Sequence, residues 1–110
     1  MTHDELIAGF EAGTIPPAAF GHREHVRLAW LYLRRHGRAG AEHRLLAGLR
    51  AFAAAAGKPD KFNAPLTLAW VARIDAAAAA LAPDHSFDDL LGHHPELLAR
   101  RAAGEVAQTI

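Results

Sequence analysis

The chain contains no cysteine and only one serine, Ser86. The lack of cysteine excludes a disulfide framework, a thiolate metal site and a cysteine nucleophile. No glycine-rich loop follows a strand pattern and no nucleophile elbow surrounds the serine, so the signatures of nucleotide-binding folds and serine hydrolases are missing too. A metal ion held by this chain would therefore need nitrogen and oxygen ligands.

The chain also lacks net charge and long apolar runs. Twelve acidic and twelve basic residues balance, which leaves no overall electrostatic footprint for nucleic acid or an anionic membrane. No apolar run approaches the roughly 20 residues that cross a bilayer, and the acidic start does not have the layout of a signal peptide. We expect a cytoplasmic protein with no nucleic-acid and no membrane partner.

Residues that favour strands are scarce, whereas alanine is abundant. No segment alternates with period two, and several segments repeat apolar residues with helical spacing. We expect an all-α fold, a compact bundle of four main helices plus one or two short C-terminal helices, forming a single domain over 1–102 with a frayed tail at 103–110. The main helices are predicted at about 2–13, 22–36, 39–56 and 64–81, and the short ones at about 86–91 and 95–102.

Local signals mark the ends of these helices. Thr2 and Glu5 have the spacing of a capping box, and Ser86 begins the same pattern later in the chain. Gly37 is predicted to end the second helix with a left-handed conformation, and Asn63 to cap the helix at 64–81. Two prolines predict a rigid connector at 14–20, in which the first proline forces Ile15 to be extended.

The predicted helix at 22–36 carries polar groups on a face that should be buried. Its body is mostly apolar, which is typical of a central helix. At about 100° per residue, His22, His25 and His36 fall within one sector, with Tyr32 at its edge. This conflict between polarity and expected burial is the main functional lead in the sequence.

His22 and His25 are the candidate metal ligands. Side chains three residues apart on a helix share a face, and two neutral imidazoles suit a divalent ion such as zinc, iron, copper or nickel. Further donors would have to come from Asn63, Asp75, His85 or Glu24. The structural alternative is that His22 caps or staples the helix start while His25 hydrogen-bonds a main-chain carbonyl of the connector at 16–19.

Three further residues are candidate ligand-binding groups. Tyr32 continues the histidine stripe, and Asn63 and Thr67 lie one turn apart at the start of a helix, where they could present an amide and a hydroxyl to the histidines. The alternatives are a core tyrosine with a satisfied hydroxyl, capping by Asn63 and a buried hydroxyl on Thr67. For His36, interaction with the helix dipole is the simpler interpretation.

Two motifs resemble those of a small uncharacterised bacterial all-α protein family. The first reads F-x-H-x-x-H-V-x-x-A-W and begins at Phe20; the second, K-[YF]-[HN]-x-x-x-T, begins at Lys61. The likeness covers roughly residues 2–98. The family commonly has histidine at the position of Asn63, which implies a metal- or substrate-binding cluster of three histidines across two helices. This chain departs from that pattern at Asn63 and is shorter at its C-terminal part.

The sequence favours a small protein with a histidine-lined pocket that binds a metal ion or a small ligand. If the pocket is catalytic, one histidine would act as a general base near neutral pH. The alternative is a non-catalytic helical interaction module, in which apolar residues of the helices at 22–36 and 64–81 form a homodimer or partner face. A third hypothesis is a degenerate enzyme, in which restoring histidine at position 63 would raise metal affinity.

Overall fold

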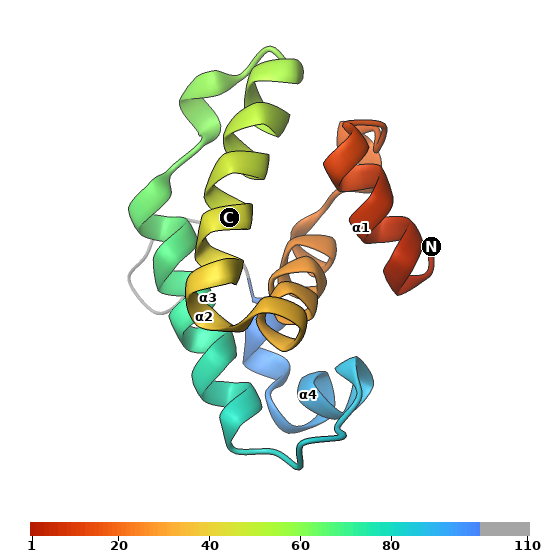
Figure 1. The fold of residues 1–110 in the computed structure, drawn as a ribbon, viewed down its shortest axis with the longest axis vertical. Helices are drawn as coiled ribbons and strands as arrows, with labels where there is room; N and C mark the ends of the chain where they lie inside the picture. Colours follow the sequence, from red (N-terminus) through yellow and green to blue (C-terminus); the bar gives the residue numbers. More distant parts are fainter. Residues whose placement is uncertain (100–110) are drawn as a thin grey trace.

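The computed structural model describes residues 1–99, which fold into helices joined by short turns. The α-helices are α1 (His3–Ala12), α2 (His22–Ala55), α3 (Ala64–Ala79) and α4 (Phe87–His93), and the 3-10 turns are η1 (Pro17–Ala19), η2 (Pro59–Lys61) and η3 (Pro95–Leu98). No strand occurs among these residues, which confirms the all-α fold class. Helix α1 lies on one side of α2 and α3 on the other, with α4 below them (Figure 1).

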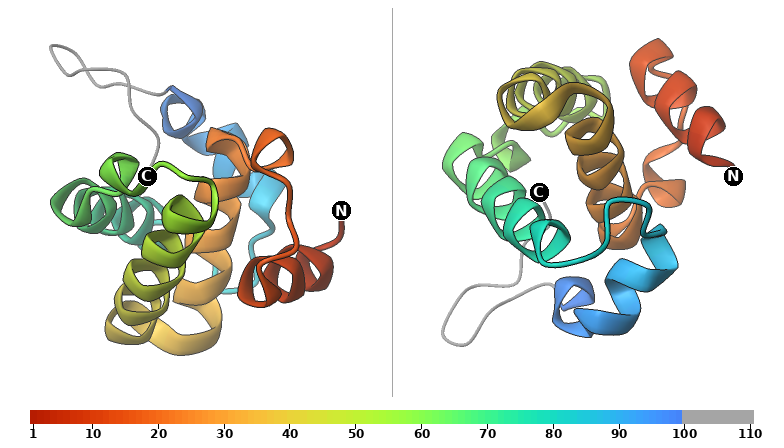
Figure 2. Two further views of the ribbon diagram at one scale, coloured as in Figure 1. Left: turned by 90° about the horizontal axis from the view of Figure 1, so that it is seen from above. Right: turned by 60° about the horizontal axis from the view of Figure 1, so that its bottom comes forward.

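Helix α2 consists of two halves that meet at Gly37. The φ of Gly37 is 74° and its ψ is −177°, so the residue is not helical. A positive φ is the conformation that glycine adopts without a steric penalty. The prediction that a helix ends there is confirmed, although its ψ differs from that of a left-handed helical residue. The two halves, 22–36 and 38–55, run side by side from this corner (left view of Figure 2).

The three predicted helix caps at Thr2, Asn63 and Ser86 are confirmed. The hydroxyl of Thr2 accepts a hydrogen bond from the main-chain N–H of Glu5 at 3.1 Å. Asn63 Oδ1 accepts one from the N–H of Leu66 at 3.0 Å, and Ser86 caps α4 in the same way. These caps satisfy N–H groups that the first helical turn leaves unpaired.

The core lies where α1, both halves of α2, α3 and α4 meet. Trp30 of α2 and Trp70 of α3 are 4% and 2% exposed, as expected for core anchors. The apolar residues that the sequence assigned to a possible partner face are mostly buried here, and among residues 1–99 the exposed large apolar side chains are Met1 and Leu98. No helix within this range has the length and apolar character needed to cross a membrane.

The C-terminal part differs from the prediction. Helix α3 ends at Ala79, two residues before the expected end, and Pro95–Leu98 form a 3-10 turn where a helix was predicted over 95–102. The rest of that predicted helix and the tail at 103–110 lie outside the described residues.

Candidate functional site

His25 is buried at the start of α2, and its ring orientation is fixed by the main chain. Its Nδ1 lies 2.8 Å from the carbonyl oxygen of Gly21. A carbonyl oxygen only accepts, so Nδ1 carries the proton and donates it, which leaves Nε2 as the acceptor nitrogen. The ring also stacks against Phe20 with centroids 4.1 Å apart. His25 therefore presents one defined acceptor atom.

Burial keeps this imidazole neutral at physiological pH. His25 is 6% exposed, and desolvation lowers its pKa from 6.5 to about 4. The hydrogen bond to Gly21 and the carboxylate of Glu24 oppose this shift, and His22 adds to it. Since burial disfavours the charged form most, the ring is an uncharged hydrogen-bond acceptor at pH 7.

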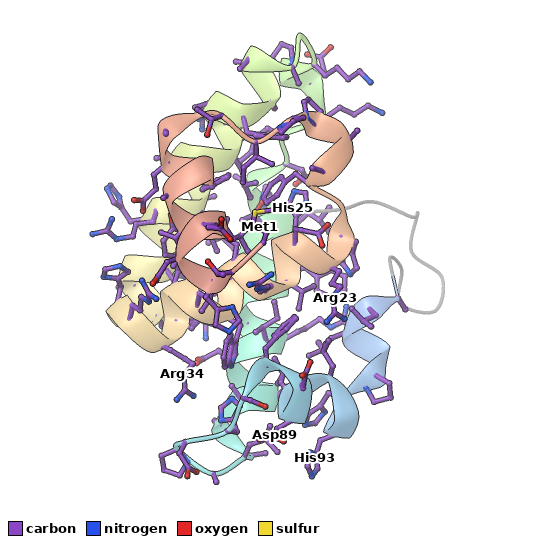
Figure 3. All side chains as sticks on the ribbon, turned by 90° about the vertical axis from the view of Figure 1, so that its right-hand side faces the viewer. Met1, Arg23, His25, Arg34, Asp89 and His93 are labelled. Atoms are coloured by element: carbon purple, nitrogen blue, oxygen red, sulfur yellow. The ribbon has the colours of Figure 1, made fainter. Side chains whose placement is uncertain are left out.

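His25 lines a small pocket, which we call the annex. Its volume is about 180 Å³. The annex lies between the connector before α2, the second half of α2 and the η2 turn. In Figure 3, His25 lies among these ribbons, whereas Arg34 and His93 extend outward. The annex is lined by Pro17, Phe20, His25, Leu49, Phe52, Ala53, Ala56, Lys58, Lys61 and Phe62.

A larger groove adjoins the annex and shares Pro17, Phe52 and Ala56 with it. Its volume is about 870 Å³. The groove runs between α1 and its following connector on one side and the second half of α2 on the other. Apolar residues form most of its wall, in particular Phe10, Ile15, Pro16, Ala47, Ala51 and Ala55. Together, groove and annex reach the size of common small-molecule sites, about 300–1,000 Å³.

Tyr32 lies at the polar end of the groove. Its hydroxyl donates a hydrogen bond to Glu11 Oε2 at 2.7 Å, and Arg44 approaches the same carboxylate oxygen at 3.9 Å. Burial, followed by the hydrogen bond to Glu11, raises the pKa of Tyr32. All three residues line the groove. The predicted role of Tyr32 in ligand binding is thus compatible with its position, with its hydroxyl already engaged as a donor.

His22 faces a different part of the molecule from His25. Its Nε2 lies 2.9 Å from the carbonyl oxygen of Leu97, and its ring packs edge-on against Trp70 with centroids 4.7 Å apart. His22 lines neither the groove nor the annex. The expectation that both imidazoles enter one pocket therefore has no support from this geometry.

No described group of side chains resembles a metal centre. Among residues 1–99, no three histidine, aspartate or glutamate side chains lie close enough together to hold an ion. The suggested additional donors have other partners: Glu24 accepts from the N–H of Gly21 at 2.9 Å, and Asp75 pairs with Arg38 at 3.6 Å. A divalent metal at His22 and His25 stays a prediction.

Asn63 and Thr67 serve the start of α3. Asn63 Oδ1 is the helix cap, and the Thr67 hydroxyl donates to the carbonyl oxygen of Asn63 at 3.0 Å while the residue is 0% exposed. Neither residue lines the groove or the annex. Their proposed ligand-binding role stays a prediction, and the structural alternative describes the contacts that they make.

The structural role of His85 was missed by sequence reasoning, which named it only as a possible metal donor. The indole N–H of Trp30 donates to His85 Nε2 at 3.0 Å, and His85 Nδ1 lies 2.6 Å from the carbonyl oxygen of Ala82. This buried contact ties the segment before α4 to α2. Fifty-five residues separate the two partners, and no local signal in the sequence indicates the pairing.

Comparison of the chain with protein-family models, curated proteins and solved structures gives no match. The resemblance to a small bacterial family stays a prediction. The candidate site consequently depends on the geometry of the chain itself.

Proposed function

We propose that this protein binds a small aromatic molecule that carries a hydroxyl or N–H donor. The ring of the ligand occupies the annex, its donor faces His25 Nε2, and the rest of the molecule extends into the groove. One observation carries the proposal: a neutral, buried imidazole, fixed by Gly21, in the wall of an aromatic pocket.

The size and lining of the annex support an aromatic ring. An apolar cavity of about 150 Å³ accommodates benzene, so the annex, at about 180 Å³, has room for one substituted ring. Phe20, Phe52 and Phe62 supply aromatic faces and edges around this space. Aromatic rings attract one another in tilted and edge-to-face arrangements beyond the effect of buried area.

His25 adds chemical selectivity to this apolar space. A ligand that displaces solvent from the annex without offering a donor leaves Nε2 unsatisfied, at a cost of about 1–3 kcal/mol. A donor at the right place avoids that cost. A site built around one buried acceptor therefore favours a hydroxylated ring over its methylated isostere.

The structure lends less support to the other expected functions. Metal binding needs His22 and His25 to converge, and they contact different elements. A homodimer or partner face needs exposed apolar surface on α2 or α3, whose large apolar side chains mostly lie in the core. Both functions stay predictions, and light scattering over a range of concentrations checks the dimer.

The proposal is tested by comparing two neutral ligands of nearly equal size. 4-Hydroxyphenylacetamide offers a donor, and 4-methylphenylacetamide replaces it with a methyl group. We expect the hydroxylated ligand to bind in about the millimolar range and about five- to tenfold more tightly than the methyl compound, measured by NMR titration.

Two matched variants assign this preference to His25. His25→Phe keeps an aromatic ring but removes the acceptor, so the preference should disappear. His22→Phe makes the same change at a buried histidine outside the annex, so the preference should persist. Absence of binding, equal binding of the two ligands by the wild type, or a preference that survives in a folded His25→Phe variant would overturn the proposal. If His25→Phe does not fold, the wild-type comparison decides.

A further inference from the structure

Lys58 and Lys61, the only lysines of the chain, both line the annex. Lys58 directly precedes the η2 turn and Lys61 is its last residue, and Pro59 fixes the backbone between them. Main-chain hydrogen bonds fix this segment. The N–H of Lys58 donates to the carbonyl of Ala53 in α2 at 2.9 Å, and the N–H of Lys61 donates to the carbonyl of Lys58 within the turn at 3.0 Å. The fold thus places both lysines in the lining of one pocket.

Neither ammonium group is neutralised by a carboxylate within the described part of the chain. Among residues 1–99, no aspartate or glutamate oxygen lies within 4.0 Å of either lysine nitrogen. Asp60 belongs to the same turn, but it is exposed and does not line the annex. The nearby arginine, Arg50, stacks its guanidinium over Phe62 at 4.9 Å from the ring centroid. All charges that line the annex are therefore positive.

Negative groups near the annex do not cancel this charge. The C-terminal end of α2 contributes about half a negative elementary charge, and the N-terminal end of α2, where His25 lies, contributes about half a positive one. The carboxylate of Glu24 acts on His25 by its charge, but it is a single negative charge and does not line the annex. Two ammonium groups at the rim of an apolar pocket thus leave a positive potential at the mouth of the annex.

We infer that the ligand of the annex is an aromatic carboxylate with a ring hydroxyl, that is, a hydroxyaryl acid. The ring lies among the phenylalanines, the hydroxyl donates to His25 Nε2, and the carboxylate lies at the mouth between Lys58 and Lys61. Lysine recognises an anion as a point charge, so the negative charge, more than its exact shape, is what the pair selects. This inference rests on the proposed function and adds the charge of the ligand.

The inference is tested with a pair of ligands that differ only in charge. 4-Hydroxyphenylacetate and 4-hydroxyphenylacetamide share the ring and the hydroxyl. At low salt we expect the carboxylate to bind about fivefold or more tightly than the amide, and the ratio to shrink in 0.5 M sodium chloride because salt screens exposed charges.

The double variant Lys58→Gln/Lys61→Gln should bring the ratio of the acid and amide affinities close to one. Because the two affinities are compared within one variant, a general change in binding to the altered annex cancels in the ratio. The control Arg35→Gln/Arg38→Gln removes the same charge at residues that line neither the annex nor the groove, and it should retain the ratio. Equal binding of acid and amide by the wild type, or a ratio that persists in the lysine variant, overturns the inference. In both cases binding of the amide still supports the proposed function. If neither compound binds, the proposed function itself fails.

Discussion

At the scale of single residues, His22 and His25 show how two histidines on one helix take different roles. Nε2 of His22 donates to Leu97, whereas Nδ1 of His25 donates to Gly21, so the two rings use different nitrogens to contact main-chain carbonyls. Three residues turn a helix by about 300°, which leaves the two side chains about 60° apart. That angle directs one ring toward Trp70 and the other toward Phe20.

The pKa of His25 predicts a loss of stability in mild acid. The folded protein holds this pKa at about 4, below the ordinary value of 6.5, so the unfolded chain binds the proton more readily. The stability that the neutral His25 ring contributes to the folded protein is complete above pH 6.5 and is lost as the pH falls toward 4. We expect the free energy of unfolding to fall by about 2 kcal/mol between pH 7 and pH 5, measured by urea denaturation.

His25→Phe should remove most of this slope, because phenylalanine does not titrate. A smaller part of the slope should remain because of His3, whose pKa is also lowered. Burial is the main cause of that shift, and the charges of Arg27 and Arg35 add to it. The substitution His93→Gln, at an exposed residue, serves as the control and should retain the full slope. A slope that is the same in wild type and His25→Phe would contradict the prediction.

At the scale of elements, the groove depends on how closely α1 approaches the second half of α2. Gly48 is the point of contact: a Cβ built on it would lie 2.4 Å from Cε2 of Phe10. The missing side chain admits the Phe10 ring, which packs on toward Phe20 and Phe52. A glycine in the middle of a helix thus sets the position of another helix.

We predict that Gly48→Ala destabilises the protein although alanine favours helix. Displacing the Phe10 ring costs about 1–3 kcal/mol, against about 1 kcal/mol gained in helix propensity, so a net loss of about 1 kcal/mol is expected. Gly92→Ala is the matched control in α4, since its Cβ meets nothing within 4 Å, and it should gain about 0.5–1 kcal/mol. Denaturant melts of both variants check this; equal stabilisation of the two would show that Phe10 does not constrain position 48.

At the scale of the whole molecule, the sequence predicted the helices well because their ends depend on local chemistry. Thr2, Gly37, Asn63 and Ser86 each act on residues within about one turn, and the structure confirms all four boundaries. The helix end at Gly37 could be predicted because only a glycine readily adopts a positive φ.

The groove, the annex and the contacts of the buried histidines were not predictable in this way. They depend on where distant segments meet. Tyr32 hydrogen-bonds Glu11, which is 21 residues away in the sequence, and His22 hydrogen-bonds Leu97, which is 75 residues away. Hydrophobic periodicity indicates that a face is buried but does not name the element that covers it. This is why the sequence indicated that the face carrying His25 is buried but did not identify Gly21 and Phe20 as the residues that His25 contacts.

The groove and annex are a product of the assembled chain, with walls from α1, the connector, both halves of α2 and the η2 turn. The most direct test of a ligand at His25 is ¹⁵N NMR of the imidazole rings during titration with 4-hydroxyphenylacetamide. We predict a proton on Nδ1 of His25 before addition and a saturable shift of the Nε2 resonance as it accepts the hydroxyl, with His22 unchanged. A His25 Nε2 resonance that stays in place while the ligand binds, or moves no more than that of His22, would contradict the proposal.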